Sequence, residues 1–206
     1  MTENLASTYQ ALYTEVLVQT ADNLRRHLAA CLEEIDRVDA VVARAKSPER
    51  FAAKALKQID GQMKYQNPLV QIHDQIGARV TVLYLTDVEP VKNAIDNYFH
   101  AIEWLEKKPE KDAEFGYFGD HYTLAIPDDV VPEGEEQRAP KFFELQIKTL
   151  FQHAWSEATH DIGYKAPREL TSHERRQMAF LAAQAWGADQ LFVALANDVV
   201  ANNDID

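Results

Sequence analysis

The octapeptide FFELQIKT, residues 142–149, constrains the fold more than any other stretch of the chain. Successive side chains of a β-strand point to opposite faces of the sheet, so the segment has two distinct faces. Three apolar residues share one face, as in a protein core: Phe143, Leu145 and Ile147. An acid, an amide and a base follow one another on the other face: Glu144, Gln146 and Lys148. That polar face is either a solvated sheet surface or the floor of a site, and the strand alone leaves both interpretations open.

The composition is that of a globular protein. With 206 residues, the chain is long enough for one domain whose core needs no disulfides or metals to hold it together. The formal net charge of −12 disfavours a broad nucleic-acid-binding surface, because phosphate neutralisation needs clustered Lys and Arg. This balance still leaves room for a local basic pocket.

The single cysteine and the N-terminal sequence indicate in which cellular compartment the protein works. Cys31 is the only cysteine, which excludes an intrachain disulfide and a zinc ribbon. The N-terminal sequence lacks the basic and then apolar layout of a signal peptide, and no stretch approaches the ~20 apolar residues of a membrane span. We therefore expect a cytoplasmic protein without a membrane partner.

Hydrophobic periodicity predicts helices around a cluster of strands. A helix is expected over 5–43, and a second one from the Ser47-Pro48 cap to about Ile59, ended by Gly61. The other expected helices are 89–99, 150–160 and 171–200. The expected strands are 78–86, 101–106, 121–127 and 142–149. The fold class is α+β or mixed α/β. We expect one domain over 1–206, with a helical N-terminal extension over 1–43 and its motifs over 44–165.

Charged residues gather at the ends of these elements. Arg44 and Lys46 precede a helix N-terminus, which favours anions, and Lys54 lies on that helix. A polyphosphate pocket and a solvated amphipathic helix both fit this pattern. Asp74 lies just before a buried strand that contains Arg79. An acid there suits Mg²⁺, which prefers one or two carboxylates plus substrate phosphates, but it equally suits a turn cap.

Two further motifs carry polar rings. The segment FGYFGDHY, 115–122, places Tyr117 and His121 in a glycine-containing loop, and aromatic rings stack on nucleobases. His153, Glu157 and His160 share one helical face. The H-E-x-x-H arrangement of metalloproteases is absent, so a structural role is favoured over zinc ligation for that face.

Taken in chain order over roughly 40–166, these motifs resemble the synthetase domain of the RelA/SpoT family in its small, single-domain form. The matching segments are RAKSPERFAAKALK (44–57), DQIGAR (74–79), GYFGDH (116–121), ELQIKT (144–149) and WSEATHDIGYK (155–165). The resemblance implies a nucleotidyltransferase-like mixed sheet of four to five strands flanked by helices, with long N- and C-terminal helices. It also implies transfer of the β,γ-pyrophosphate of ATP to the 3′-hydroxyl of GDP or GTP, which makes the alarmone (p)ppGpp.

The resemblance assigns roles residue by residue. The implied catalytic pair is Asp74 and Glu144, which would hold Mg²⁺, with Glu144 as the base for the 3′-hydroxyl. The implied ATP phosphate contacts are Arg44, Lys46, Lys54 and, as their companion, Arg79. Tyr117 would stack on the acceptor base, and His121 and Gln146 would line the acceptor pocket. Lys148 stands where the family often has arginine, so it keeps the charge but lacks the planar fork.

The acceptor side departs from the family pattern. Phe118 and Gly119 stand where the family often has arginine or glutamine and then serine, and 112–115 lacks a frequent lysine. These changes favour keeping other acceptors as alternatives, because some family toxins pyrophosphorylate the tRNA 3′ CCA end or make (p)ppApp. A toxin would imply a neutralising antitoxin.

Three other hypotheses remain. One is a metal phosphohydrolase, from the His-Asp pairs at 73–74 and 160–161, and another is a catalytically silent nucleotide-binding module. The third concerns assembly, because the apolar 171–200 helix is either a homo-oligomer interface or ordinary core.

Overall fold

The computed structural model describes residues 2–109, 111, 114–116, 119–165 and 168–203. Five strands form one mixed sheet in the order β1-β4-β7-β6-β5. Their bounds are β1 Val38–Ala45, β4 Ile76–Val82, β5 Ala101–Lys107, β6 Gly119–Ala125 and β7 Phe142–Thr149. The β4–β7 pair is parallel, and the other pairs are antiparallel. The expected mixed sheet flanked by helices is confirmed.

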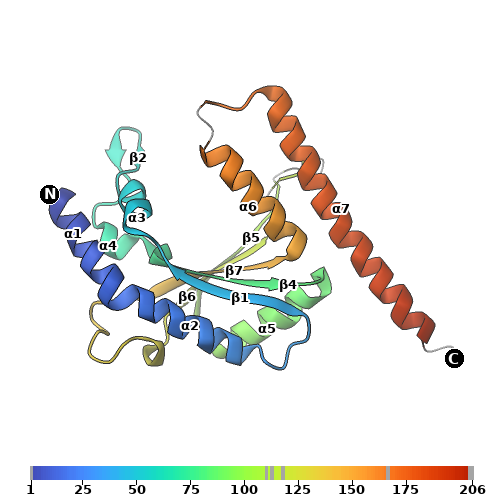
Figure 1. Ribbon diagram of the computed structural model, residues 1–206, viewed down its shortest axis with the longest axis horizontal. Helices are drawn as coiled ribbons and strands as arrows, with labels where there is room; N and C mark the ends of the chain where they lie inside the picture. Colours follow the sequence, from blue (N-terminus) through green and yellow to red (C-terminus); the bar gives the residue numbers. More distant parts are fainter. Residues whose placement is uncertain (1, 110, 112–113, 117–118, 166–167, 204–206) are drawn as a thin grey trace.

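Helices cover both faces of this sheet. Figure 1 shows α2 and α5 on one face and α3 and α6 on the other. The helical segments of the first half are α1 Thr2–Leu12, the π-helical η1 Tyr13–Leu17, α2 Val18–Cys31, α3 Pro48–Ala55, α4 Pro68–Gln71 and η2 His73–Gln75. Those of the second half are η3 Leu85–Asp87, α5 Val88–Tyr98, η4 Asp128–Val130, α6 Leu150–Lys165 and α7 Ser172–Asn203.

The expected helix over 5–43 is wrong in its last part. The continuous helix formed by α1, η1 and α2 ends at Cys31. Val38 is the first residue of β1, which pairs with β4 along its length. Val41 and Val42 are β-branched and fit a pleated surface better than a helix. The pairing with β4 decided the outcome, and it brings Arg44 to the end of a strand.

The second helix begins as expected and ends early. The Ser47 side chain accepts a hydrogen bond from the backbone N–H of Arg50 (3.4 Å), and Pro48 opens α3. The helix ends at Ala55, and a short hairpin follows, with strands β2 Gln58–Ile59 and β3 Gln62–Met63. Asp60 and Gly61 have φ values of 51° and 76°, as a two-residue hairpin turn requires. Gly61 therefore turns a hairpin instead of ending the helix.

The two faces of the octapeptide are as expected. The apolar side chains Phe143, Leu145 and Ile147 are fully buried in the core formed with α2 and α5. Glu144 and Gln146 are partly exposed on the opposite face. The alternation in the sequence thus separates a core from a site.

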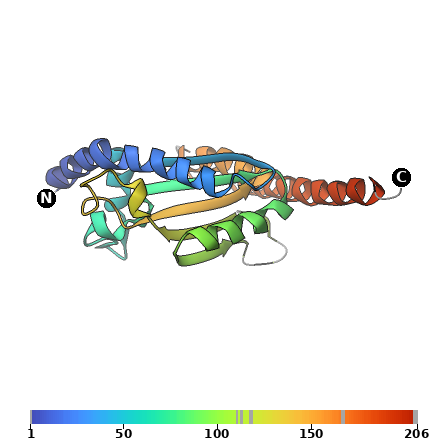
Figure 2. The same cartoon turned by 90° about the horizontal axis from the view of Figure 1, so that it is seen from below.

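The long helix α7 runs past the edge of the sheet to the C-terminus, as Figures 1 and 2 both show. Phe180, Leu191 and Leu195 are exposed on it. Within the described residues, Ser172–Val199 is long and apolar enough to cross a membrane by length and composition alone. The sequence expectation that no stretch approaches such a length is therefore wrong, although a single such helix is weak evidence for a membrane span.

Candidate active site

A cleft of about 1130 Å³ lies over the polar face of β4 and β7. Residues of the β1–α3 junction line one side, and residues of α6 line the other. Eight of the expected site residues line this cleft: Arg44, Lys46, Asp74, Arg79, His121, Glu144, Gln146 and Lys148. Lys54 reaches the same place through Asp74. Tyr117 lies outside the described residues, so its expected stacking role stays a prediction.

One end of the cleft concentrates positive charge around a single carboxylate. Asp74 Oδ2 lies 3.1 Å from Lys46 Nζ and 2.7 Å from Lys54 Nζ. All three side chains are partly buried, at 19–29% exposed, so these ion pairs are less screened by solvent than fully exposed pairs. The second carboxylate oxygen, Oδ1, is buried and has no hydrogen-bond partner in the part of the chain that the structure describes.

The N-terminal helix fixes the position of this cluster. Tyr9 is fully buried, its ring stacks on Phe51 of α3 at 3.6 Å between centroids, and its hydroxyl donates to the Lys46 carbonyl (2.9 Å). The Lys46 backbone N–H donates to the Gln75 carbonyl (2.8 Å), which ties β1 to the turn that carries Asp74. Sequence patterns gave no sign of the role of Tyr9, because its partners are distant in the chain.

The centre of the cleft is built around Glu144. Strand pairing places His121 opposite Gln146, two residues along from Glu144. Gln146 Nε2 donates to Glu144 Oε1 (2.8 Å), and His121 Nδ1 lies 3.1 Å from the same oxygen. Burial acts to raise the pKa of Glu144, but the hydrogen bonds from His121 and Gln146 outweigh it and lower the pKa to about 2. Glu144 is therefore ionised throughout the physiological pH range.

A buried lysine is the last of the three polar residues on the cleft face of β7. Lys148 is 3% exposed, and its Nζ donates to Ser156 Oγ of α6 (3.1 Å). Burial, and then the charge of Arg79, lowers the pKa of Lys148 to about 8. Arg79 in turn contacts Glu157 of α6 at 3.3 Å. These contacts attach α6 to the sheet and keep two cations facing the cleft.

The two acids expected to form a metal pair line the same cleft with different partners. Asp74 binds lysines, whereas Glu144 binds His121 and Gln146. Among the residues that the structure describes, no group of three or more His, Cys, Asp or Glu side chains is arranged to hold a metal ion. The expected Mg²⁺ site at Asp74 and Glu144 therefore stays a prediction, and it would need substrate phosphates as further ligands.

Comparison with known proteins identifies the family to which this fold and cleft belong. Residues 43–169 match the family model of the region found in RelA / SpoT proteins. The chain belongs to this family. No curated protein sequence matches it.

Solved structures share this fold across nearly the whole chain. Small alarmone synthetase 1 from Bacillus subtilis has a TM-score of 0.72 at 16% identity, covering 97% of each chain. A GTP pyrophosphokinase family protein from Streptococcus pneumoniae has a TM-score of 0.71 at 18% identity, covering 91% of this chain and 93% of its own. The Bacillus protein has also been solved with its product pppGpp and with AMPCPP. Membership of the family supports a pyrophosphotransferase activity. The solved structures, at identities this low, show only that the fold is shared.

Proposed function

We propose that this protein transfers the β,γ-pyrophosphate of ATP to the 3′-hydroxyl of GDP or GTP and so makes (p)ppGpp. The observation that carries the proposal is the layout of one cleft, with a lysine-rich end at the start of α3 and the ionised Glu144 at its centre. Phosphoryl-type transfers rely on positioning and charge stabilisation more than on covalent chemistry by the protein. A row of cations and one oriented carboxylate meets that requirement.

The lysine-rich end suits the phosphates of ATP. Lys46 and Arg44 lie just before α3, where free N–H groups add to the positive potential. Lys46 and Lys54 bind Asp74 in the structure. We expect both ammonium groups to turn toward the phosphates when ATP enters, because three phosphate groups offer more negative charge than one carboxylate.

The residues present also fit Mg²⁺. Asp74 Oδ1 is a buried acceptor without a partner among the described residues, which is costly unless a ligand satisfies it. Asp74 and Glu144 would hold the ion together with substrate phosphates. Bound Mg²⁺ would offset negative charge on the transferred phosphates.

Glu144 is our candidate base for the 3′-hydroxyl. In the transfer, the ribose O3′ bonds to the β-phosphorus of ATP, the bond to the α-phosphate oxygen breaks, AMP leaves, and Glu144 takes the hydroxyl proton. A carboxyl group with a pKa of about 2 is a weak base. An acceptor hydroxyl that displaces His121 from Oε1 would remove the contact that lowers this pKa, and Glu144 would then become a stronger base when the substrate is in place.

An acceptor panel tests the proposal. The protein is incubated with γ-labelled ATP, Mg²⁺ and one acceptor at a time: GDP, GTP, ADP, ATP or tRNA. We expect label on GDP or GTP together with release of AMP. Label on tRNA or on adenosine nucleotides would replace our acceptor by the one found, labelled phosphate released without an acceptor would indicate a hydrolase, and binding without transfer would indicate a silent module.

A further inference from the structure

The first helix, α1, lies beside α3 at the lysine-rich end of the cleft (Figure 1). It precedes residues 43–169, so it lies outside the region that the family model covers. One of its side chains, Tyr9, contacts both parts of this end: its ring stacks on Phe51 of α3, and its hydroxyl donates to the Lys46 carbonyl. We propose that Tyr9 is a positioning residue for polyphosphate binding, which acts by holding Lys46 in place. This inference rests on the function proposed above.

The π-helical turn η1 decides which side chain of α1 faces the cleft. The inward-facing residues before and within this turn are Leu5, Tyr9, Leu12 and Val16, and those after it are Leu17, Ala21, Leu24 and Leu28. Each series has the spacing of one α-helical face, but the second begins one residue after the first ends. Leu12 and Leu17 are thus five positions apart, which is the hydrogen-bonding interval of a π-helix.

This extra residue turns Tyr9 toward α3. In an unbroken α-helix each residue adds a rotation of about 100°, so without the π-helical turn α1 would be rotated by about that angle relative to α2. Tyr9 would then lose its contacts with Phe51 and Lys46. Turns of this kind are rare in helices and frequently lie at functional sites, which agrees with a role for Tyr9 beyond core packing.

The hydrogen bond from Tyr9 holds the backbone of Lys46 from one side. Tyr9 is fully buried, and burial, followed by the charge of Asp74, raises the pKa of its hydroxyl. The hydroxyl therefore stays protonated and remains a donor at physiological pH. The Gln75 carbonyl accepts from the Lys46 N–H (2.8 Å) on the other side. Both polar groups of this peptide backbone are thus fixed.

A fixed backbone matters because the Lys46 ammonium lies at the end of a flexible side chain. Its Nζ contacts Asp74 Oδ2, which Lys54 also contacts. Anchoring the backbone limits the positions that the ammonium can reach, so less freedom is lost when a polyphosphate binds. The Tyr9 hydroxyl touches no reacting atom in this arrangement, and its effect passes through Lys46.

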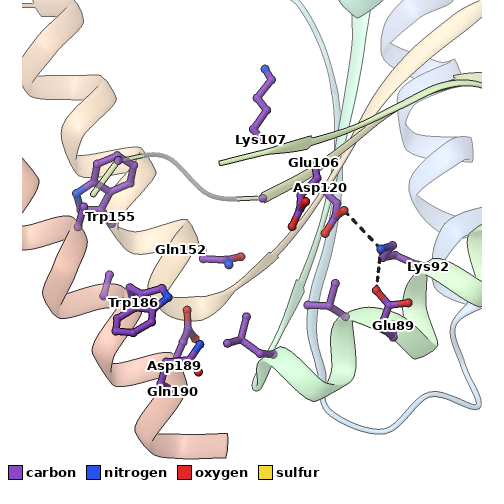
Figure 3. Close-up of a pocket in the computed structure, with 16 residues that line it drawn as sticks. Glu89, Lys92, Glu106, Lys107, Asp120, Gln152, Trp155, Trp186, Asp189 and Gln190 are labelled. Atoms are coloured by element: carbon purple, nitrogen blue, oxygen red, sulfur yellow. Dashed lines mark hydrogen bonds and ion pairs between the residues drawn. The ribbon is translucent and has the colours of Figure 1, made fainter. Parts of the chain in front are cut away.

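The other charged wall beside the cleft does not suit polyphosphate. A smaller pocket of about 260 Å³ adjoins the cleft between α5, α6 and α7 (Figure 3). Its charged lining residues are the acids Glu89, Glu106, Asp120 and Asp189 and the bases Lys92 and Lys107. Figure 3 shows Lys92 paired with Glu89 and Asp120, at 2.7 Å and 3.7 Å. The acids outnumber the bases there, so phosphates are attracted to the end that Tyr9 supports.

A double-mutant cycle tests whether Tyr9 acts through Lys46. Tyr9→Phe keeps the ring that stacks on Phe51 and removes the hydroxyl. We measure kcat and the KM for ATP and for GDP in the native protein, Tyr9→Phe, Lys46→Ala and the double variant. Tyr9→Phe should raise the KM for ATP at least about threefold and leave kcat and the KM for GDP near native. In the Lys46→Ala background it should change the KM for ATP less than about twofold, because the residue through which it acts is gone.

Tyr13→Phe, which removes a hydroxyl about one turn further along the same helix, is the matched control and should keep native kinetics. An unchanged KM for ATP in Tyr9→Phe would overturn the inference, even if its melting temperature fell, because Tyr9 would then be a core residue only. Equal effects of Tyr9→Phe in the native and Lys46→Ala backgrounds would also overturn it.

If no acceptor gives product, the proposed function fails instead. Calorimetric binding of tripolyphosphate to the same four proteins then decides the inference. It stands only if Tyr9→Phe weakens binding in the native background and has no further effect in the Lys46→Ala background.

Discussion

Replacing Glu144 by glutamine separates a catalytic carboxylate from a residue of the sheet surface. The change keeps the size and the strand but removes the charge that would bind Mg²⁺ and accept the 3′-hydroxyl proton. General-base catalysis contributes about 10²–10⁴-fold, so kcat for transfer to GDP should fall at least about a hundredfold. The assay is initial-rate AMP release at saturating ATP and GDP. Glu103→Gln, an exposed acid on β5, should keep native kcat.

The same change has a stability effect that the structure lets us estimate. Lowering the pKa of Glu144 from 4.5 to about 2 corresponds to about 3 kcal/mol in favour of the folded, ionised form. Glutamine can still accept from Gln146, so we expect a net loss of about 1–3 kcal/mol in the free energy of unfolding near neutral pH.

The pH dependence of stability tests the direction of the pKa shift of Glu144. A carboxyl group whose pKa is lower in the folded state stabilises above its unfolded pKa and loses this contribution as pH falls toward the folded value. The stability difference between native protein and Glu144→Gln should thus shrink as pH falls from 4.5 toward about 2. Denaturant unfolding at several pH values measures it. Near-native kcat in Glu144→Gln would refute the catalytic role, and a pH-independent difference would refute the His121 and Gln146 account of its pKa.

Three further predictions follow from the same contacts. Lys46→Ala should raise the KM for ATP strongly and leave the KM for GDP near native, and equal effects on both substrates would contradict its placement at the donor end. His121→Ala removes the main hydrogen bond that lowers the pKa of Glu144. The fall of kcat/KM on the acidic side of its pH profile should therefore begin at a higher pH than in the native protein. A profile that does not move would contradict the role of the His121–Glu144 contact. Lys148 has its pKa lowered to about 8 by burial, so native stability should gain between about pH 8 and 10 as the buried charge is lost, and Lys148→Met should lack this gain in denaturant titrations.

The sequence by itself determined the elements whose signals are local. The alternation in 142–149 gave a strand with a core face and a polar face, and Ser47-Pro48 gave the start of α3. In both cases the deciding interactions involve residues within a few positions of each other, which is the range that periodicity and capping patterns cover. The order of the motifs along the chain was enough to predict the family, because the members of the family carry these motifs in the same order.

Only the tertiary structure decided what depends on pairing between distant segments. Val38–Ala45 is a strand because β4 lies beside it, although the preceding apolar spacing predicted a helix. Strand register, which no local pattern encodes, brings His121 to Glu144, and the fold brings Lys46 and Lys54 to Asp74. Asp189 meets Thr149 across 40 residues of sequence, because α7 packs on α6 and returns to the end of β7. Burial and charge pairing arise only on folding, so the pKa values of Glu144, Lys148 and Asp189 had no counterpart in the sequence.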